Sequence, residues 1–113
     1  MTFDDGRNAA ILRRTLSAIS WVYALWSFML GGMAGAGSLA AKLLIAHGAL
    51  LGAAGTLLWK PRRAAIPATL LAAAGSIFFV FYDLGLGNSQ AACTDGGYVV
   101  VAIALLYKSR AQT

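Results

Sequence analysis

Few residues of this 113-residue chain could do chemistry, and four of them border long apolar segments: Lys42, His47, Asp83 and Asp95. An ionisable group in apolar surroundings is costly, which makes each one a candidate functional residue. Asp83 and Asp95 could together bind a cation or a proton, and Lys42 could pair with either of them. The simpler interpretations are that Lys42 extends to lipid headgroups, that Asp83 ends a helix at the membrane interface, and that Asp95 caps a helix N-terminus.

His47 is the only histidine of the chain and lies inside an apolar segment. An imidazole there could ligate haem or a chlorophyll, shuttle protons or contact a polar substrate. A haem held by two histidines needs a second one, which a partner subunit would have to supply. The simpler interpretation is a neutral ring that is hydrogen-bonded to a serine or to a backbone carbonyl.

Other chemistries lack their residues in this sequence. Cys93 is the only cysteine, so the chain can form no internal disulfide, although the thiol could link two chains or stay free. No group of histidine, cysteine and carboxylate residues has the spacing of a metal site, and neither a nucleophilic triad nor a phosphate-binding loop is present. The chain also contains no glutamate. We therefore predict a protein that is not an enzyme and that has no cofactor or metal of its own.

Hydropathy indicates which solvent surrounds the candidate residues. Apolar residues make up 59% of the chain and charged residues only 12%, about half the charged share of a typical soluble protein. Apart from His47, the ranges 16–38, 43–59 and 64–82 contain no charged residue. A helix that crosses the hydrocarbon core needs about 20 apolar residues, so each range predicts one membrane span.

The fourth apolar segment, YVVVAIALLY at 98–107, is shorter than the other three. It reaches spanning length only if its helix begins near Ala91, and the alternative is three spans plus a short interfacial segment. Because the connections are short, we predict an all-α integral membrane protein, an up-down bundle of four transmembrane helices that forms one domain over 1–113. Pro61 is expected to end the second helix, and Pro67 to lie in the first turn of the third. The predicted helices cover about 11–32, 39–59, 64–83 and 91–108.

Basic residues predict the orientation of this bundle. Only Lys42 falls on one side of the predicted membrane, and the other lysines and arginines all fall on the opposite side. Cytoplasmic loops carry the excess of positive charge, so we expect both termini in the cytoplasm, and the composition favours a bacterial inner membrane. Because topology accounts for the basic residues, we predict no nucleic-acid partner. The residues on the cytoplasmic side are Arg7, Arg13, Arg14, Lys60, Arg62, Arg63, Lys108 and Arg110.

The first apolar segment allows a second interpretation. Its basic start, apolar middle and small residues resemble a secretory signal peptide, and the Arg13–Arg14 pair resembles a twin-arginine signal. The apolar stretch is longer than the roughly 7–15 residues of a signal-peptide core. We therefore expect the segment to be kept as the first span.

Small residues recur at helical spacing on three of the predicted helices. In a bilayer, small residues let helices approach closely, and this packing holds the helices together. The stretch HGALLGAAG at 47–55 places three glycines on one face of the second helix. Such faces could pack within one chain or between chains. The predicted packing residues are Ser20, Ala24, Ser27, Gly48, Gly52, Gly55, Ala68, Ala72 and Gly75.

The larger side chains are expected elsewhere. Tyr23, Trp26 and Leu30 lie on the side of the first helix opposite its small residues, so we predict that they face lipid or a partner. Tyr82 and Tyr98 fall near predicted span ends, where aromatic residues gather at the membrane interface.

Three hypotheses for function follow. The first is a small non-catalytic accessory or structural subunit of a larger membrane assembly, because small-residue faces are present and catalytic groups are not. The second is a small homo-oligomeric transporter or channel for ions or small polar solutes, in which Lys42, His47, Asp83 and Asp95 line a polar site. The third is a haem- or pigment-binding subunit, which rests on His47 alone. The expected partners are the lipid bilayer and either other membrane subunits or further copies of this chain.

Overall fold

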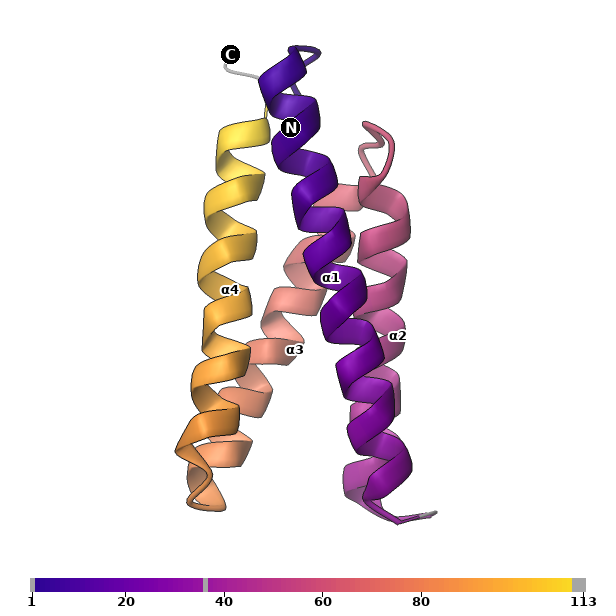
Figure 1. Cartoon of the computed structure of the whole chain (residues 1–113), viewed down its shortest axis with the longest axis vertical. Coiled ribbons are helices and arrows are strands. Elements are labelled where there is room, and N and C mark those ends of the chain that lie inside the picture. The colour runs from indigo at the N-terminus through magenta and orange to yellow at the C-terminus, as the bar shows by residue number, and fades with distance from the viewer. Residues whose placement is uncertain (1, 36, 111–113) are drawn as a thin grey trace.

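The computed structural model describes residues 2–35 and 37–110, which form four α-helices that run alternately up and down (Figure 1). Each helix is long and apolar enough to cross a membrane, so the predicted all-helical, four-helix architecture is confirmed. Both chain ends and the α2–α3 loop lie at one end of the bundle, which we call the terminal end; the α1–α2 and α3–α4 loops lie at the other, the hairpin end. The helices are α1 (Arg7–Met33), α2 (Leu39–Leu58), α3 (Ala65–Gly85) and α4 (Ser89–Ser109).

Local signals explain where α2 and α3 begin and end. The Ser38 hydroxyl accepts a hydrogen bond from the Ala41 backbone N–H at 3.1 Å, so Ser38 caps the N-terminus of α2. Helix α2 ends at Leu58, three residues before Pro61, which disfavours a helical residue before it. Pro67 lies in the first turn of α3, where its missing N–H leaves no hydrogen bond unmade.

Helix α4 begins earlier than the sequence suggested. Asn88 caps it, because its side-chain oxygen accepts a hydrogen bond from the Ala91 N–H at 3.2 Å. The prediction that Asp95 caps this helix is therefore wrong, and Asp95 instead lies in its second turn. Tyr98 was predicted near a span end, but it lies midway along α4, and its side chain is 0% exposed. The helix was predicted to begin near Ala91, and it begins two residues earlier, at Ser89.

The four helices form a ring. Helix α1 contacts α2, α2 contacts α3, α3 contacts α4 and α4 contacts α1, while no contact joins the diagonal pairs within the described helices. In Figure 1 the α1–α2 hairpin and the α3–α4 hairpin meet toward the terminal end and diverge toward the hairpin end. The bundle is therefore closed at one end and open between the hairpins at the other.

Small residues allow the close contact between α1 and α2. A Cβ atom added at Gly48 would lie 3.3 Å from the Ala24 carbonyl oxygen, and one at Gly55 would lie 3.0 Å from the Ser17 carbonyl oxygen. At this separation the Ser17 hydroxyl donates a hydrogen bond to the Gly55 carbonyl. The Ser27 hydroxyl donates to the Leu44 carbonyl at 2.6 Å. The predicted stripes thus lie within one chain, between two of its own helices.

Polar groups also join α1 and the segment before it to α2 and α4. The buried Arg13 guanidinium donates to the Leu58 carbonyl at 2.6 Å, which satisfies a carbonyl that the last turn of α2 leaves without a helical partner. The hydroxyls of Ser20 and Tyr98 lie 2.9 Å apart and join α1 to α4. The Asp4 N–H donates to the Ser109 carbonyl at 2.9 Å, so the two ends of the chain are also joined.

We predict that Gly55→Ala destabilises the protein by about 1–3 kcal/mol, the usual cost of overpacking. The added methyl group would meet the Trp21 ring, which can rotate away, and the Ser17 carbonyl, which is part of α1 and cannot. Gly52→Ala is the matched control, because a Cβ there meets only Ala24 Cβ at an ordinary 3.9 Å. Thermal unfolding in detergent measures both variants. Equal melting temperatures for the two would contradict the α1–α2 contact described above.

Candidate functional site

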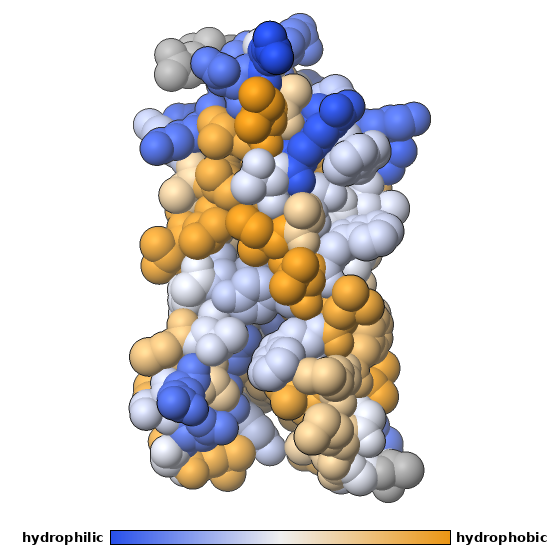
Figure 2. All heavy atoms as spheres, in the orientation of Figure 1, coloured by the Kyte–Doolittle hydropathy of each residue, from blue (hydrophilic) through white to orange (hydrophobic). Residues whose placement is uncertain are grey.

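A cleft between the two hairpins is the candidate site. It lies toward the hairpin end, all four helices contribute to its walls, and its volume is about 330 Å³. Figure 2 shows the same opening as a hollow in the lower half of the front face. Small-molecule sites occupy roughly 300–1,000 Å³, so the cleft has the size of a site for one small ligand.

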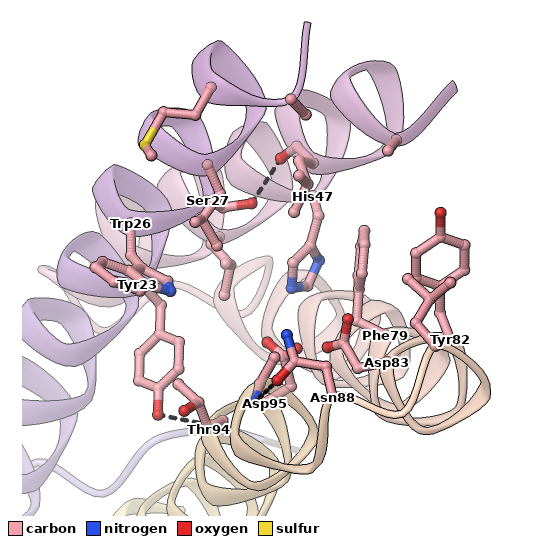
Figure 3. A pocket seen from close by; sticks show the side chains of 18 residues that line it. Tyr23, Trp26, Ser27, His47, Phe79, Tyr82, Asp83, Asn88, Thr94 and Asp95 are labelled. Atoms are coloured by element: carbon pink, nitrogen blue, oxygen red, sulfur yellow. Dashed lines mark hydrogen bonds between the residues drawn. The ribbon is translucent and has the colours of Figure 1, made fainter. Parts of the chain in front are cut away.

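One wall of the cleft is acidic. Asp83 comes from the last turn of α3 and Asp95 from the second turn of α4, and both side chains are half-buried. In Figure 3 their carboxyl groups gather with the Asn88 amide on one side of the cavity. No lysine or arginine occurs among the described residues that line the cleft. The cleft therefore carries negative charge without a basic side chain to balance it.

His47 of α2 lines the cleft opposite this acidic wall (Figure 3). Its side chain is 5% exposed, and its Nε2 lies 3.1 Å from the Ser76 hydroxyl on α3. This is the serine partner that the simpler interpretation of His47 expected. Nδ1 is buried and has no hydrogen-bond partner among the described residues. The ring can approach α3 because Gly75 has no side chain, since a Cβ there would lie 2.7 Å from Nδ1.

Aromatic rings form much of the remaining wall. Tyr23 and Trp26 come from α1, and Phe79 and Tyr82 come from α3. The Tyr23 hydroxyl donates to the Thr94 carbonyl at 2.9 Å, which fixes this ring beside α4. The centroid of the Phe79 ring lies 5.0 Å from that of the His47 ring. The cleft is thus lined by aromatic rings and by a small number of polar groups.

These aromatic residues correct one sequence-based expectation and extend another. Tyr23, Trp26 and Leu30 line the cleft, although they were predicted to face lipid or a partner. The reason is that α1 packs on two neighbours, α2 and α4, and the side between these two contacts faces the cleft. Tyr82 is half-buried in the cleft as well as near a helix end. The spacing of Tyr23, Trp26 and Leu30 predicted that they share one face of α1, but it did not predict which part of the molecule that face contacts.

The remaining candidates lie outside the cleft. Lys42 is exposed on α2 and is not part of the lining, so the structure brings together His47, Asp83 and Asp95 but not Lys42. Cys93 is an exposed free thiol. Its neighbours Thr94 and Asp95 line the cleft, whereas Cys93 does not. Asn88 is a cleft residue that the sequence analysis missed, although a cap ahead of a helix could have revealed it.

Metal and cofactor chemistry finds little support in this geometry. Within residues 2–35 and 37–110, no group of three or more histidine, cysteine or carboxylate side chains could hold a metal ion. The His47 Nε2 atom is already engaged with Ser76, so it is not an open axial ligand for haem. The arrangement is suited instead to reversible binding of a small polar molecule, with carboxylates, an amide and aromatic faces as the contacting groups.

Comparison with known proteins gives no match: no family model, no curated protein and no solved structure matches the chain. The interpretation of the cleft therefore depends on its own residues and geometry.

We predict that the cleft contains water. In a Cys93→Ser background, Trp26→Cys places a thiol on the cleft wall and Leu25→Cys places one on the outer apolar surface one residue away. Because thiols react as thiolates, which form in water, a charged, water-soluble maleimide should modify position 26 at least tenfold faster than position 25 in membranes. Equal slow rates at both positions would show that the cleft is dry.

Proposed function

We propose that this chain is a small integral membrane protein that binds a small polar solute in the cleft and carries it across the membrane, without a catalytic step. One observation carries the proposal. His47, Asp83 and Asp95 come from three different helices and converge on one cavity that is open at one end of the bundle. Ionisable residues that face the interior of a membrane bundle mark substrate and ion pathways.

The contacts between the hairpins are compatible with the movement that transport requires. Carriers expose their site to each side in turn, commonly when one helical unit rocks against another. Here each hairpin is one compact unit, and the cleft lies between the two units. The units are joined midway along α1 and α4 by the Ser20–Tyr98 contact and at the terminal end by the Asp4–Ser109 hydrogen bond. Opening the cleft toward the terminal end would require these contacts to break.

We further propose that the terminal end faces the cytoplasm of a bacterial cell and that the protein resides in its inner membrane. The basic residues at the N-terminus, the α2–α3 loop and the C-terminus all belong to this end, and only Lys42 lies toward the other. The positive-inside rule favours this orientation. The cleft would then open to the non-cytoplasmic side in the form described here.

A transport assay tests the proposal. Protein reconstituted in liposomes is expected to exchange at least one of three impermeant labelled solutes: choline, mannitol or gluconate. Asp83→Asn and Asp95→Asn should lower this exchange at least tenfold, because each removes a charge from the cleft. Asp5→Asn is the matched control, since Asp5 is exposed and lies outside the cleft. Folded protein that exchanges none of the solutes contradicts the transport proposal.

A second observation favours an accessory-subunit function. An open apolar groove of about 660 Å³ lies between α1 and α2 on the outside of the bundle, with Trp21 and Trp59 on its walls and Ala18 among its small residues. Trp21 is 53% exposed. A groove with a floor of small residues can receive a helix of another membrane subunit. In this second proposal the chain packs as a structural subunit of a larger assembly.

The accessory proposal predicts a stoichiometric partner. The native complex, gently extracted at natural expression, should contain a second membrane protein, and Ala18→Trp should remove it by filling the groove. Ala104→Trp places the same bulk on the exposed surface of α4 and should leave the complex intact. A wild-type protein that purifies alone, as a monomer or homo-oligomer, rules out this second proposal.

A further inference from the structure

We infer that the ligand of the cleft is a small organic cation, which the carboxylates of Asp83 and Asp95 bind by charge and the aromatic walls bind by their ring faces. This inference rests on the proposed function, because it names the class of solute for the same site.

The charge of the cleft is the first argument. Both carboxyl groups face the cavity, and no lysine or arginine among the described lining residues is available to pair with them. Two carboxylates on the same wall of a cavity repel each other, and the repulsion is strong where water is partly excluded. A cation between them removes the repulsion and provides the missing partner. An anion would meet two carboxylates and no basic group.

The aromatic lining is the second, independent argument. Trp26 and Tyr23 stand on α1, and Phe79 and Tyr82 stand across the cavity on α3. The faces of aromatic rings carry negative potential and attract cations, and rings grouped around a cavity are a known means of binding organic ammonium groups. A neutral sugar-like solute would instead need many hydrogen-bonding groups. Several polar groups of the lining are already engaged within the chain, since the hydroxyls of Tyr23, Ser27 and Thr94 donate to backbone carbonyls.

The size and donor set of the cavity separate an organic cation from a metal ion. The volume of about 330 Å³ greatly exceeds the space that one bare ion occupies. Metal ions of the calcium and magnesium type require about six oxygen ligands at short distance. Within residues 2–35 and 37–110, no three histidine, cysteine, aspartate or glutamate side chains gather at one place. Two carboxylates and the Asn88 amide in the cleft fall short of that number of oxygen ligands. A molecule that carries its charge on a carbon framework fits both observations.

His47 contributes a further feature of the inner wall. The ring is more than nine-tenths buried, and its Nδ1 has no hydrogen-bond partner among the described residues. Buried polar atoms in folded proteins nearly always have a partner, which can be a ligand or a bound water. Nδ1 is packed against α3, where a Cβ added at Gly75 would lie 2.7 Å from it, so the cation assignment does not depend on this atom.

Trp26 provides a direct reporter of binding. It is the one tryptophan of the three that lines the cleft, because Trp21 and Trp59 lie in the outer groove. With Trp21→Phe and Trp59→Phe, fluorescence at Trp26 follows occupancy of the cleft alone. The probes are four cations, namely choline, tetramethylammonium, guanidinium and putrescine. Mannitol and gluconate represent the other charge classes, and 3,3-dimethylbutan-1-ol is the uncharged shape analogue of choline.

We expect at least one cation to change the fluorescence saturably, with the affinity reduced at least tenfold by Asp83→Asn and by Asp95→Asn. Asp5→Asn should leave it unchanged, and circular dichroism checks that each variant is folded. Choline, if it is bound, should bind at least tenfold more tightly than 3,3-dimethylbutan-1-ol.

The other outcomes separate the inference from the proposed function. Binding of mannitol or gluconate but of no cation overturns the cation assignment and leaves solute transport standing. Equal affinity for choline and its uncharged analogue also overturns it, because charge then plays no part. Binding of Na⁺ or Mg²⁺ alone, without any organic cation, replaces the assignment with a metal ion. A folded protein that binds none of the probes overturns the inference and the proposed function together.

Discussion

The close contact between α1 and α2 is the constraint on which the rest of the bundle depends. Glycines on α2 bring the two backbones near enough for Ser17 and Ser27 to donate hydrogen bonds to carbonyl groups of α2. In a bilayer, such interhelical hydrogen bonds contribute on average about 0.6 kcal/mol each, and van der Waals packing adds to them. Because α1 is held against α2, it does not reach α3, and the space that remains between the hairpins becomes the cleft.

In the described part of the chain, the polar groups of the bundle are of two kinds, those with a partner inside the chain and those without one. The serines and Arg13 on α1 have partners inside the chain, so they join helices. The carboxylates of Asp83 and Asp95 face a cavity that contains no basic side chain among its described residues. A group with its partner inside the fold stabilises the fold, whereas a group that lacks one there is available to a ligand.

Much of this architecture could be predicted from the amino-acid sequence, and the reasons are specific. Uncharged ranges of spanning length predicted α1, α2 and α3, because a bilayer excludes charge over a known thickness. The beginning of α4 was predicted two residues late, near Ala91, because the cap at Asn88 was not recognised. The cleft itself could not be predicted. Its lining depends on how far each helix is rotated about its axis. A stripe of small residues such as the one on α1 identifies only one of the two helix faces that contact neighbours.

The unknown rotation of each helix about its axis also explains why the candidate residues chosen from the sequence include some that line the cleft and one that does not. Charge in an apolar context was enough to select His47, Asp83 and Asp95, but it selected Lys42 equally well, since the sequence does not show which side of a helix faces the bundle. The aromatic residues Tyr23 and Trp26 were assigned to the lipid side for a related reason, because large apolar side chains suit lipid and cavity walls alike.

In the proposed orientation, the depth of the cleft would couple cation binding to the membrane voltage. Asp95, the deeper of the two carboxylates, lies six residues along α4 from the hairpin end, which corresponds to about 9 Å at a rise of roughly 1.5 Å per residue. The hydrocarbon core is about 30 Å thick, so a cation bound there would cross up to roughly 30% of the electric field. With about 2.3 kcal/mol per charge for each 100 mV across the whole membrane, the field would contribute about 0.7 kcal/mol to the binding of one cation. A cell that is negative inside would draw the cation inward, so its resting potential would raise occupancy of the cleft about threefold above the value in a de-energised membrane.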